Sequence, residues 1–524
     1  MIATVNPALN RGLDKFGAEM HATPVAQTIR NEDVMRGGNQ FARLLDAVGV
    51  PQRGVVAALL RNTPEMLFAN RGTTWSGRRF TPMSWRWTPE ECEYVVGNCE
   101  AELFVADAKF AAAARAAAHC VAPDRRFVVG GEIEGFQPFE DVYAFSSDPL
   151  ENPLCGDVMM YTSGTTGRPK GVLRPNFPEG PPPTMIAEAG MAMFRAFLPD
   201  SGSQGPHPGA HLACGPLYHA GPNTYCEGAL MLGADVVLLD RFDPEEVLAT
   251  IEKHAVMSAF MVPTHFVRLL RLPEATRKKY DLSSLQLIMH GAAPVAIEVK
   301  RQMIDWLGPI LFEFYGGTEG GGCMIGSKEW LERPGSVGRP RPGLTVHIFD
   351  QKGREVPAGT EGDVYFPLSD SPFVYKDDPE KTLGSRRNGF FTMGDIGYVD
   401  SDGYLFLCDR SADVIISGGV NIYPAQIEAA LLGLPFVADV CVIGVPNDEW
   451  GEEVRALVQL VAGQNTPNED EARSEITAHC RGELSGYQVP REIEFRTELP
   501  RTEAGKIARR LLRDPYWEGR SRRV

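Results

Sequence analysis

The sequence predicts an α/β protein with a large N-terminal domain of stacked, mostly parallel α/β sheets, a small β-barrel and a small α+β C-terminal domain. Three observations support this class. Short β-branched runs alternate with helical patterns over about the first 330 residues, as in parallel sheets with crossover helices. Glycine and proline then become dense and the strands shorten, which is typical of a small antiparallel barrel or sheet. From about Ser411 a compact group of helices and strands follows.

The first elements are a buried strand and a well-marked helix start. Gly54 to Leu60 (GVVAALL) is an apolar run of strand length. We expect Thr63 to cap the next helix and Pro64 to lie in its first turn, where no N–H is needed. The alternation continues with strand Ala101 to Asp107, helix Ala108 to His119, strand Ala234 to Leu239, a helix capped by Asp243 that runs to about His254, strand Leu285 to His290 and helix Val295 to Leu307.

The later elements are shorter and more interrupted. A proline-rich patch, Pro175 to Pro183, is expected to be a surface loop. The barrel or sheet comprises strands Leu344 to Asp350, Gly362 to Phe366, Gly397 to Val399 and Tyr404 to Leu407. The C-terminal unit comprises helix Pro424 to Leu432, strands Val437 to Val445 and Val454 to Val461, and helix Asn468 to Leu484.

Charge and composition exclude several classes of function. With 52 Lys and Arg against 68 Asp and Glu, the net charge is −16, which argues against nucleic acid as a partner. No apolar run approaches the roughly 20 residues that span a bilayer. Residues 1–20 lack the apolar core of a signal peptide. The ten cysteines show no C-x-x-C spacing, which argues against a zinc ribbon and indicates buried thiols of a cytoplasmic protein.

A loop rich in glycine and hydroxyl residues follows the apolar strand Asp157 to Tyr161. Such a loop can turn its main-chain N–H groups toward one anion, and Lys170 adds a positive charge. It is not a Walker A loop, because arginine and proline separate Gly167 from Lys170. From composition alone, a merely flexible loop stays an alternative. The candidate phosphate-binding residues are Thr162, Ser163, Gly164, Thr165, Thr166, Gly167 and Lys170.

The ordered string Tyr161 to Gly171 (YTSGTTGRPKG) resembles the phosphate loop of the adenylate-forming superfamily. That superfamily comprises acyl-CoA synthetases, peptide-synthetase adenylation domains and luciferases, and this chain resembles its acyl-CoA synthetase branch. The resemblance extends over nearly the whole chain. It implies that the loop binds ATP and that the C-terminal domain is mobile.

Three further motifs of the nucleotide site are similar to those of the family. Within Phe314 to Glu319 (FYGGTE), the resemblance implies that Tyr315 and Gly316 bind ATP, the tyrosine by stacking on adenine. Thr318 would meet the α-phosphate and Glu319 would hold Mg²⁺, which prefers carboxylate and phosphate oxygens. Gly291, Ala292 and Ala293 resemble the segment that lines the adenine; they could also form a strand-to-helix turn, and both interpretations can hold at once. Asp395 and Arg410 resemble the residues that bind the ribose.

The C-terminal motifs imply a hinge, a catalytic lysine and a CoA site. Val414 to Glu428 resembles the start of the family's mobile domain, and Pro500 to Ile507 resembles the motif that carries its catalytic lysine, here Lys506. We therefore divide the chain into residues 1–410, a hinge at 411–413 and residues 414–524. The hinge position often holds an acidic residue or lysine in the family, whereas here it is Ala412. The CoA-binding candidates are Ser417, Gly418, Gly419 and Trp450, the last of which could instead be a half-buried core residue.

The acyl-binding candidates are His219, Ala220, Gly221, His265, Gly317 and Gly320. The small residues leave little side-chain volume, which favours a long-chain, cyclic, steroid-like or aryl hydrophobic acid. The alternative is that these glycines serve backbone geometry only. His219 could gate the tunnel or contact the carboxylate, or it could be a packing residue. No acidic residue stands beside His265 in sequence, which argues against an amino-acid substrate.

The implied reaction has two steps. A carboxylate attacks the α-phosphorus of ATP, releasing pyrophosphate and leaving an acyl-adenylate, and the thiol of coenzyme A then forms an acyl-CoA thioester and releases AMP. The ligands are therefore ATP, Mg²⁺, CoA and a small-molecule carboxylic acid. Two alternatives remain: transfer of the acyl group to an amine or carrier protein, and a non-catalytic nucleotide- or acyl-binding paralogue. Homodimers are common in the family, so a homodimer stays open.

Overall fold

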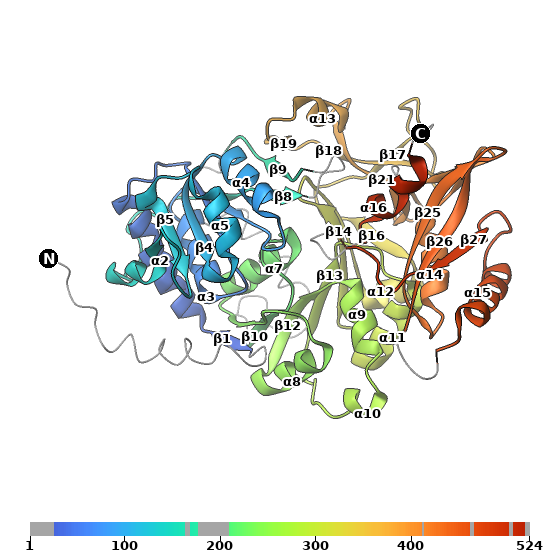
Figure 1. Ribbon diagram of the computed structural model, residues 1–524, viewed down its shortest axis with the longest axis horizontal. Helices are drawn as coiled ribbons and strands as arrows, with labels where there is room; N and C mark the ends of the chain where they lie inside the picture. The colour runs from blue at the N-terminus through green and yellow to red at the C-terminus, as the bar shows by residue number, and fades with distance from the viewer. Residues whose placement is uncertain are drawn as a thin grey trace. The chain divides into compact units, whose positions relative to one another are not determined.

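The computed structural model describes residues 26–162, 168–176, 209–410, 413–461, 466–501 and 507–518. Two compact units make up the chain (Figure 1). The first unit contains residues 1–261, 271–290 and 370–379, and the second contains residues 262–270, 291–369 and 380–524. The motif boundary that we predict at residues 411–413 falls within the second unit and stays a prediction.

The first unit contains a fully parallel sheet in the order β6-β5-β4-β2-β3-β7. Its central strand β2 is buried on both faces: Val55, Ala57 and Leu59 belong to one hydrophobic cluster, while Val56 and Ala58 belong to another. Such burial explains the continuous apolar run in the sequence. The strands are β2 (Val55–Leu59), β3 (Arg79–Pro82), β4 (Ala101–Asp107), β5 (Arg126–Val129), β6 (Gln137–Pro138) and β7 (Asp157–Val158).

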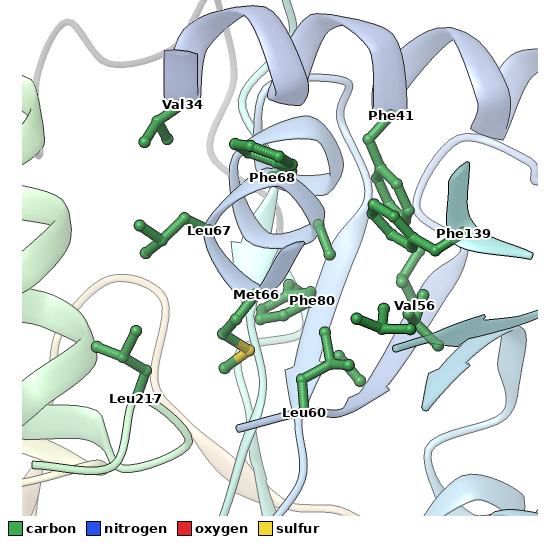
Figure 2. Close-up of a cluster of buried hydrophobic side chains, with 14 of the residues drawn as sticks. Val34, Phe41, Val56, Leu60, Met66, Leu67, Phe68, Phe80, Phe139 and Leu217 are labelled. Atoms are coloured by element: carbon green, nitrogen blue, oxygen red, sulfur yellow. The ribbon is translucent and has the colours of Figure 1, made fainter. Parts of the chain in front are cut away.

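Helices cover both faces of this sheet. Helices α2 (Asn31–Ala47) and α3 (Pro64–Thr74) contribute to one cluster, which Figure 2 shows, and α4 (Pro89–Asn98) and α5 (Ala111–Ala118) contribute to the other. Phe41 of α2 stacks on Phe139 at 5.8 Å between ring centroids. The predicted helix from Ala108 begins as a short 3₁₀ turn, η1 (Ala108–Phe110), because Asp107 accepts from the amide of Lys109 and tightens the first residues. Two more 3₁₀ turns are η2 (Pro123–Arg125) and η3 (Phe139–Ala144).

Two other groups of paired strands lie in the first unit. The strands β10 (Ala210–Ala213), β11 (Asp235–Leu238), β12 (Val256–Met261) and β13 (Leu287–Gly291) run parallel, and β1 (Gln27–Ile29) pairs antiparallel with β11. A small antiparallel sheet has the order β19-β9-β8, with β8 (Met160–Thr162), β9 (Lys170–Leu173) and β19 (Val374–Tyr375). The helices are α7 (Ala220–Met231), α8 (Pro244–His254) and α10 (Glu274–Arg277). Asp243 caps α8 as predicted, accepting from the amides of Glu245 and Glu246.

In the second unit, antiparallel strands follow one another in the order β14-β15-β16-β22-β21-β18-β17. We expected a small barrel or an antiparallel sheet here, and the described strands form a sheet without barrel closure. Strand β16 pairs with β15 on one edge and with β22 on the other, so no edge of β16 is left to close a ring with β17. The strands are β14 (Leu311–Gly317), β15 (Gly320–Gly326), β16 (Ser336–Pro340), β17 (His347–Phe349), β18 (Gly362–Pro367), β20 (Arg386–Arg387), β21 (Phe390–Val399) and β22 (Leu405–Arg410). The helices are α9 (Pro263–Leu270), α11 (Ile297–Leu307), α12 (Ser327–Glu332) and α13 (Pro379–Gly384).

The last part of the second unit is an α+β sheet in the order β24-β23-β26-β25, with β27 parallel to β26. Its apolar core joins the sheet to α14 and α15 through residues such as Ile427, Val442 and Ile476. The strands are β23 (Ile415–Ser417), β24 (Val420–Ile422), β25 (Val437–Asn447), β26 (Gly451–Leu460) and β27 (Glu492–Phe495). The helices are α14 (Pro424–Leu432), α15 (Glu469–Glu483), α16 (Arg509–Arg513) and the 3₁₀ turn η4 (Asp514–Trp517).

Two more findings concern the described residues. None of their helices is both long and apolar enough to cross a membrane. All ten cysteines lie among these residues as free thiols, and eight of them are buried, as the sequence predicted.

Candidate active site

The predicted phosphate loop connects β8 to β9 in the first unit. Thr162 of β8 pairs with Lys170 of β9, so both ends of the loop are fixed by an antiparallel ladder. Ser163, Gly164, Thr165, Thr166 and Gly167, which form the loop itself, lie outside the described residues. The structure therefore describes the strand before the loop and the lysine that begins the strand after it.

Lys170 forms an ion pair with Asp378, a residue that the sequence analysis missed. Its Nζ lies 2.5 Å from Oδ2 of Asp378, and the side chains are 13% and 29% exposed. Strand β19 places this carboxylate by pairing with β9, and the amide of Lys376 donates to the carbonyl of Gly171. The two charges are 208 residues apart in sequence, so no local pattern could have joined them.

A second polar group supports the same strands. Asp377, in left-handed backbone conformation with φ of 57°, accepts from Nδ2 of Asn98 at 2.8 Å. Oδ1 of Asn98 accepts from the hydroxyl of Tyr161 at 2.6 Å. This chain of hydrogen bonds ties β8, α4 and the segment after β19 together at the base of the predicted phosphate loop.

Three predicted nucleotide-binding residues meet in the second unit. The hydroxyl of Tyr315 on β14 donates to Oδ2 of Asp395 on β21 at 2.7 Å. Arg410 of β22 pairs with Asp395 in register, and its Nε lies 3.2 Å from Oδ1. Burial, together with the negative charge of Asp395, raises the pKa of Tyr315, so its hydroxyl stays a donor. Each carboxylate oxygen of Asp395 thus has a partner, which fixes its orientation.

Strand β14 is anchored by a buried ion pair. Nζ of Lys300 on α11 lies 2.5 Å from Oε2 of Glu313 on β14, with side chains 0% and 7% exposed. The ammonium also lies 4.7 Å above the ring of Trp330. Because Glu313 and Tyr315 are two residues apart, their side chains share one face of the strand. The pair therefore fixes the strand that presents Tyr315.

Thr318 and Glu319 form the tip of the hairpin between β14 and β15. Gly317 pairs with Gly320, which leaves these two residues as the loop. A Cβ at Gly317 would lie 2.6 Å from Sδ of Met393 and 2.7 Å from Oε2 of Glu319, so a larger residue there would displace both side chains. The described residues contain no group of three or more His, Cys, Asp or Glu that could hold a metal ion. Glu319 still suits Mg²⁺, since this ion usually takes one or two carboxylates together with phosphate oxygens and waters.

The segment predicted to line the adenine is a tight strand-to-helix turn. Gly291 ends β13, and a Cβ there would lie 2.3 Å from the carbonyl oxygen of Phe314 on β14. Ala292 has a φ of 69°, a strained conformation for a residue with a side chain. Ala293 follows, and α11 begins at Ile297. Both interpretations of this segment, as a turn and as a nucleotide wall, stay compatible with its geometry.

The predicted acyl segment begins helix α7 of the first unit. His219 is its N-cap residue, followed by Ala220 and Gly221. A Cβ at Gly221 would lie 2.6 Å from Cζ of Phe260, and Phe260 stacks on Tyr225 at 5.2 Å. The space that this glycine leaves is therefore filled by protein.

The glycines after Glu319 have a similar explanation. The φ angles of Gly320, Gly321 and Gly322 are 128°, 75° and 142°, values that favour glycine regardless of space. At Gly221 and here, packing and backbone geometry account for the glycines, so small residues alone do not argue for a bulky acid.

His265 lies on α9 in the second unit. Its Nδ1 accepts from the amide of Val262 at 3.5 Å. Burial, with a contribution from the charge of Arg268, lowers the pKa of His265 to about 3. At neutral pH the ring is uncharged, so it can meet a ligand through hydrogen bonds or packing but not as a cation.

The predicted CoA residues come together in the second unit. Ser417 pairs with Val420, which leaves Gly418 and Gly419 as a two-residue turn with φ of 58° and 82°. The amide of Gly418 donates to the carbonyl of Trp450 at 2.8 Å, and a Cβ there would lie 2.7 Å from the indole. Trp450 is 41% exposed, so it is a surface aromatic rather than a core residue.

The remaining predicted residues, Ala412 and Lys506, lie outside the described residues. The residue after the hinge position, Asp413, is held by two arginines that the sequence analysis did not select. Its carboxylate lies 3.6 Å from Nε of Arg509 and 3.7 Å from Nη1 of Arg513. Arg509 also forms a two-pronged contact with Glu428 at 2.8 and 3.1 Å.

Comparison with known proteins agrees with these motifs. The family model described as AMP-binding enzyme matches residues 32–368, and that of the AMP-binding enzyme C-terminal domain matches residues 426–506. The chain is 28% identical over 520 residues to a long-chain-fatty-acid–CoA ligase of Bacillus subtilis, covering 92% of this chain and 89% of the relative. It is 31% identical over 505 residues to a feruloyl-CoA synthase of an Amycolatopsis species, covering 94% and 96%.

A solved structure has the same fold. The amide bond synthetase McbA from Marinactinospora thermotolerans superposes with a TM-score of 0.76 at 26% identity, over 92% of this chain and 94% of that chain. From the motifs, the meeting of Tyr315 with Asp395 and Arg410, and these matches, the chain belongs to the AMP-binding enzyme family of adenylate-forming ligases, whose ligands are ATP, Mg²⁺ and CoA.

Proposed function

We propose that this protein is an ATP-dependent carboxylic acid:CoA ligase. In the first step a carboxylate attacks the α-phosphorus of ATP, pyrophosphate leaves, and an acyl-adenylate forms. In the second step the thiol of CoA attacks the acyl carbonyl, AMP leaves, and an acyl-CoA thioester remains. The observation that carries the proposal is the arrangement of Tyr315, Asp395 and Arg410, which come from three strands and meet through one carboxylate.

The nucleotide fits this arrangement through its sugar and base. Asp395 is 7% exposed and held by two donors, so its carboxylate is oriented before any ligand binds. Such a carboxylate can accept hydrogen bonds from the ribose hydroxyls, and the ring of Tyr315 offers a flat face on which the adenine can stack. Preorganised polar groups of this kind bind without a further cost of rearrangement.

The phosphates would contact Lys170 directly and Glu319 through Mg²⁺. Lys170, near the end of the loop, supplies a positive charge toward the phosphates. Glu319 would hold Mg²⁺ together with phosphate oxygens, and the ion would neutralise phosphate charge. No protein nucleophile is needed, because positioning and charge neutralisation supply most of the rate in phosphoryl chemistry. Lys506 is proposed to bridge the carboxylate and the α-phosphate.

CoA is proposed as the acceptor on the strength of the surface formed by Ser417, Gly418, Gly419 and Trp450. An exposed indole next to a turn without side chains offers a flat apolar face and room for a narrow chain. We propose that residues 414–524 rotate on a hinge at 411–413 between the two steps. In that scheme residues 1–410 hold ATP and the acid.

The acid is proposed to be hydrophobic: a long-chain, cyclic, steroid-like or aryl acid. The support is the names of the relatives, a long-chain-fatty-acid–CoA ligase and a feruloyl-CoA synthase. An amino acid is disfavoured, because no acidic residue stands beside His265 in sequence to pair with its ammonium group. We also propose a cytoplasmic location. We further propose a homodimer, and light scattering of the purified protein would test this oligomeric state.

One observation favours a second acceptor. One solved structure with the same fold is an amide bond synthetase, so an amine could take the place of the CoA thiol. Transfer to a carrier protein is a third variant of the same chemistry. A non-catalytic paralogue is disfavoured, because Lys170, Glu319, Asp395, Arg410 and Lys506 are all present.

The test is a panel assay with purified protein, ATP, Mg²⁺ and CoA, run with and without an added primary amine. Acids of increasing size and an amino acid are compared by release of pyrophosphate and AMP, and products are identified by mass spectrometry. We expect an acyl-CoA from octanoate or larger acids. Faster turnover of acetate or the amino acid would overturn the hydrophobic substrate, and an amide in place of a thioester would overturn CoA. A Lys506→Ala variant should fold but release no pyrophosphate, whereas unchanged release would refute the role of this lysine.

A further inference from the structure

Both main-chain polar groups of one residue before helix α7, Leu217, are held by asparagine side chains. The amide of Leu217 donates to Oδ1 of Asn62 at 2.9 Å. The carbonyl of Leu217 accepts from Nδ2 of Asn223 at 2.9 Å. The side chain of Leu217 is 1% exposed and belongs to the hydrophobic cluster shown in Figure 2. Main chain and side chain of this residue are therefore both fixed.

Asn62 uses its whole side chain on this part of the fold. Besides accepting from Leu217, its Nδ2 donates to the carbonyls of Gly215 at 2.9 Å and Leu239 at 3.0 Å. It follows β2, so it lies at the carboxyl end of a parallel sheet, where ligand-binding loops gather in α/β folds. An aspartate here would keep the acceptor but would place a carboxylate against two carbonyl oxygens.

Asn223 continues the arrangement into helix α7. It is 5% exposed, and its main-chain N–H donates to the carbonyl of His219 at 3.0 Å, a bond of the helix itself. Its Oδ1 accepts from Asn70 of α3 at 3.5 Å, and Asn70 also donates to Glu227 at 3.1 Å. Arg71 completes the group through an ion pair with Glu227 at 2.8 Å. A nearly continuous polar network thus links α3 to the segment from Gly215 to His219.

We propose that Asn62 and Asn223 are positioning residues for acid recognition. Their side chains fix the N–H and the carbonyl of Leu217, two residues before the N-cap residue His219, so the chain that leads into α7 is held in one conformation. The inference rests on the proposed function, in which His219 borders the acyl group. A displacement of about 1 Å at such a site is enough to reduce a rate by roughly a hundredfold.

Three variants test the proposal, each compared with the parent enzyme. Asn223→Ala removes the donor to Leu217, and Asn62→Ala removes its acceptor. Asn39→Ala is the matched control, because Asn39 is also buried, at 7% exposed, and donates to a main-chain carbonyl, that of Ser147, at 3.1 Å. If the alanine variants fail to fold, Asn223→Ser and Asn62→Ser replace them, because serine keeps a short, neutral polar side chain at each position.

The measurements are kcat and KM for two acids of different length, KM for ATP, and the unfolding temperature. For both site variants we expect KM for the acid to rise by roughly tenfold and the preference between the two acids to change, with KM for ATP within about twofold. The control should lose a similar amount of stability and keep the acid preference. A second readout is hydrogen exchange of the segment 213–219, which we expect to lose protection in Asn62→Ala.

Two results overturn the inference. One is an acid preference that changes no more in the site variants than in Asn39→Ala. The other is an equal effect on the KM values for acid and ATP. Either result in an enzyme that makes acyl-CoA leaves the proposed function intact. If the parent enzyme activates no carboxylic acid, the proposed function fails and the positioning role fails with it. This holds even if hydrogen exchange shows that Asn62 fixes the segment 213–219.

Discussion

The hydroxyl of Tyr315 donates to the carboxylate of Asp395 at 2.7 Å, although the two residues are 80 positions apart in the chain. Arg410 holds the other oxygen of the same carboxylate. The carboxylate of Asp395 therefore has one defined orientation. Any further hydrogen bond that it accepts must come from a direction that these two partners do not occupy. The predictions below start from this carboxylate and move to the other parts of the site.

Replacing Tyr315 by phenylalanine should raise KM for ATP by roughly threefold to tenfold. The ring is kept, but the buried carboxylate loses a charged hydrogen bond worth about 1.5–3 kcal/mol, and its orientation is released. Initial rates at varied ATP concentration measure the effect. Tyr404→Phe is the control, since it removes a hydroxyl that donates to Glu329. An equal change in KM for both variants would contradict the assignment.

Asp378→Asn should lower KM for ATP by roughly threefold to tenfold. Asp378 offsets the charge of Lys170, so this carboxylate and the triphosphate compete for one ammonium group. The effect should shrink at high ionic strength, because salt screens such partly exposed charges. Asp377→Asn is the control, as the neighbouring carboxylate accepts from Asn98 instead. An unchanged or higher KM for ATP would show that Asp378 does not compete with the phosphates.

Gly418→Ala should slow thioester formation while the release of pyrophosphate persists. The added Cβ would lie 2.7 Å from the indole of Trp450 and would displace it from the turn. Gly419→Ala is a matched control: its φ of 82° imposes similar backbone strain, but no atom lies within 4 Å of the added group. Single-turnover measurements of both steps separate the effects. If the two variants behave alike, strain rather than the indole determines the second step.

Asp409→Asn should stabilise the protein above pH 6. Asp409 accepts from the amide of Ala425, and burial raises its pKa to about 6 despite the nearby charge of Arg509. The folded state thus holds the proton more tightly than the unfolded chain. The stability from this group is present below about pH 4 and is lost as the pH rises to about 6.

The gain from that variant amounts to at most about 3 kcal/mol, which corresponds to a shift of roughly two pKa units. Urea unfolding at pH 4 and pH 8 measures it. The variant and the parent should agree at the lower pH and differ at the higher one. A variant that is less stable than the parent at pH 8 would show that the ionised carboxylate is favourable where it lies.

Much of the fold follows from local patterns. The strand Ala101–Asp107 and the helix Pro424–Leu432 have the bounds that the sequence predicts. The first is a run of apolar residues of strand length, and the second begins at a proline. The bounds of such elements are determined by residues that are only a few positions apart in the sequence. The choice between a barrel and an open sheet could not be made in this way, because it depends on both edges of β16 being used.

The site divides along the same line. Motif order identified Tyr315, Asp395 and Arg410, and the structure brings them together. Asp378 and the clamp formed by Asn62 and Asn223 were missed, because each acts on a segment more than 100 residues away or through a main-chain group that no motif records. Gly221 shows the opposite error: its small size suggested space, but the ring of Phe260 fills it.

The chain passes between its two units five times, and the short segment 370–379 returns to the first unit after nearly eighty residues in the second. That segment brings Asp378 to Lys170. When genes of this family recombine at a single crossover between these two positions, the lysine comes from one parent and its carboxylate from the other. Chimaeras built to exchange substrate preference should therefore inherit residues 370–379 together with the phosphate loop, as two inserts from the same parent.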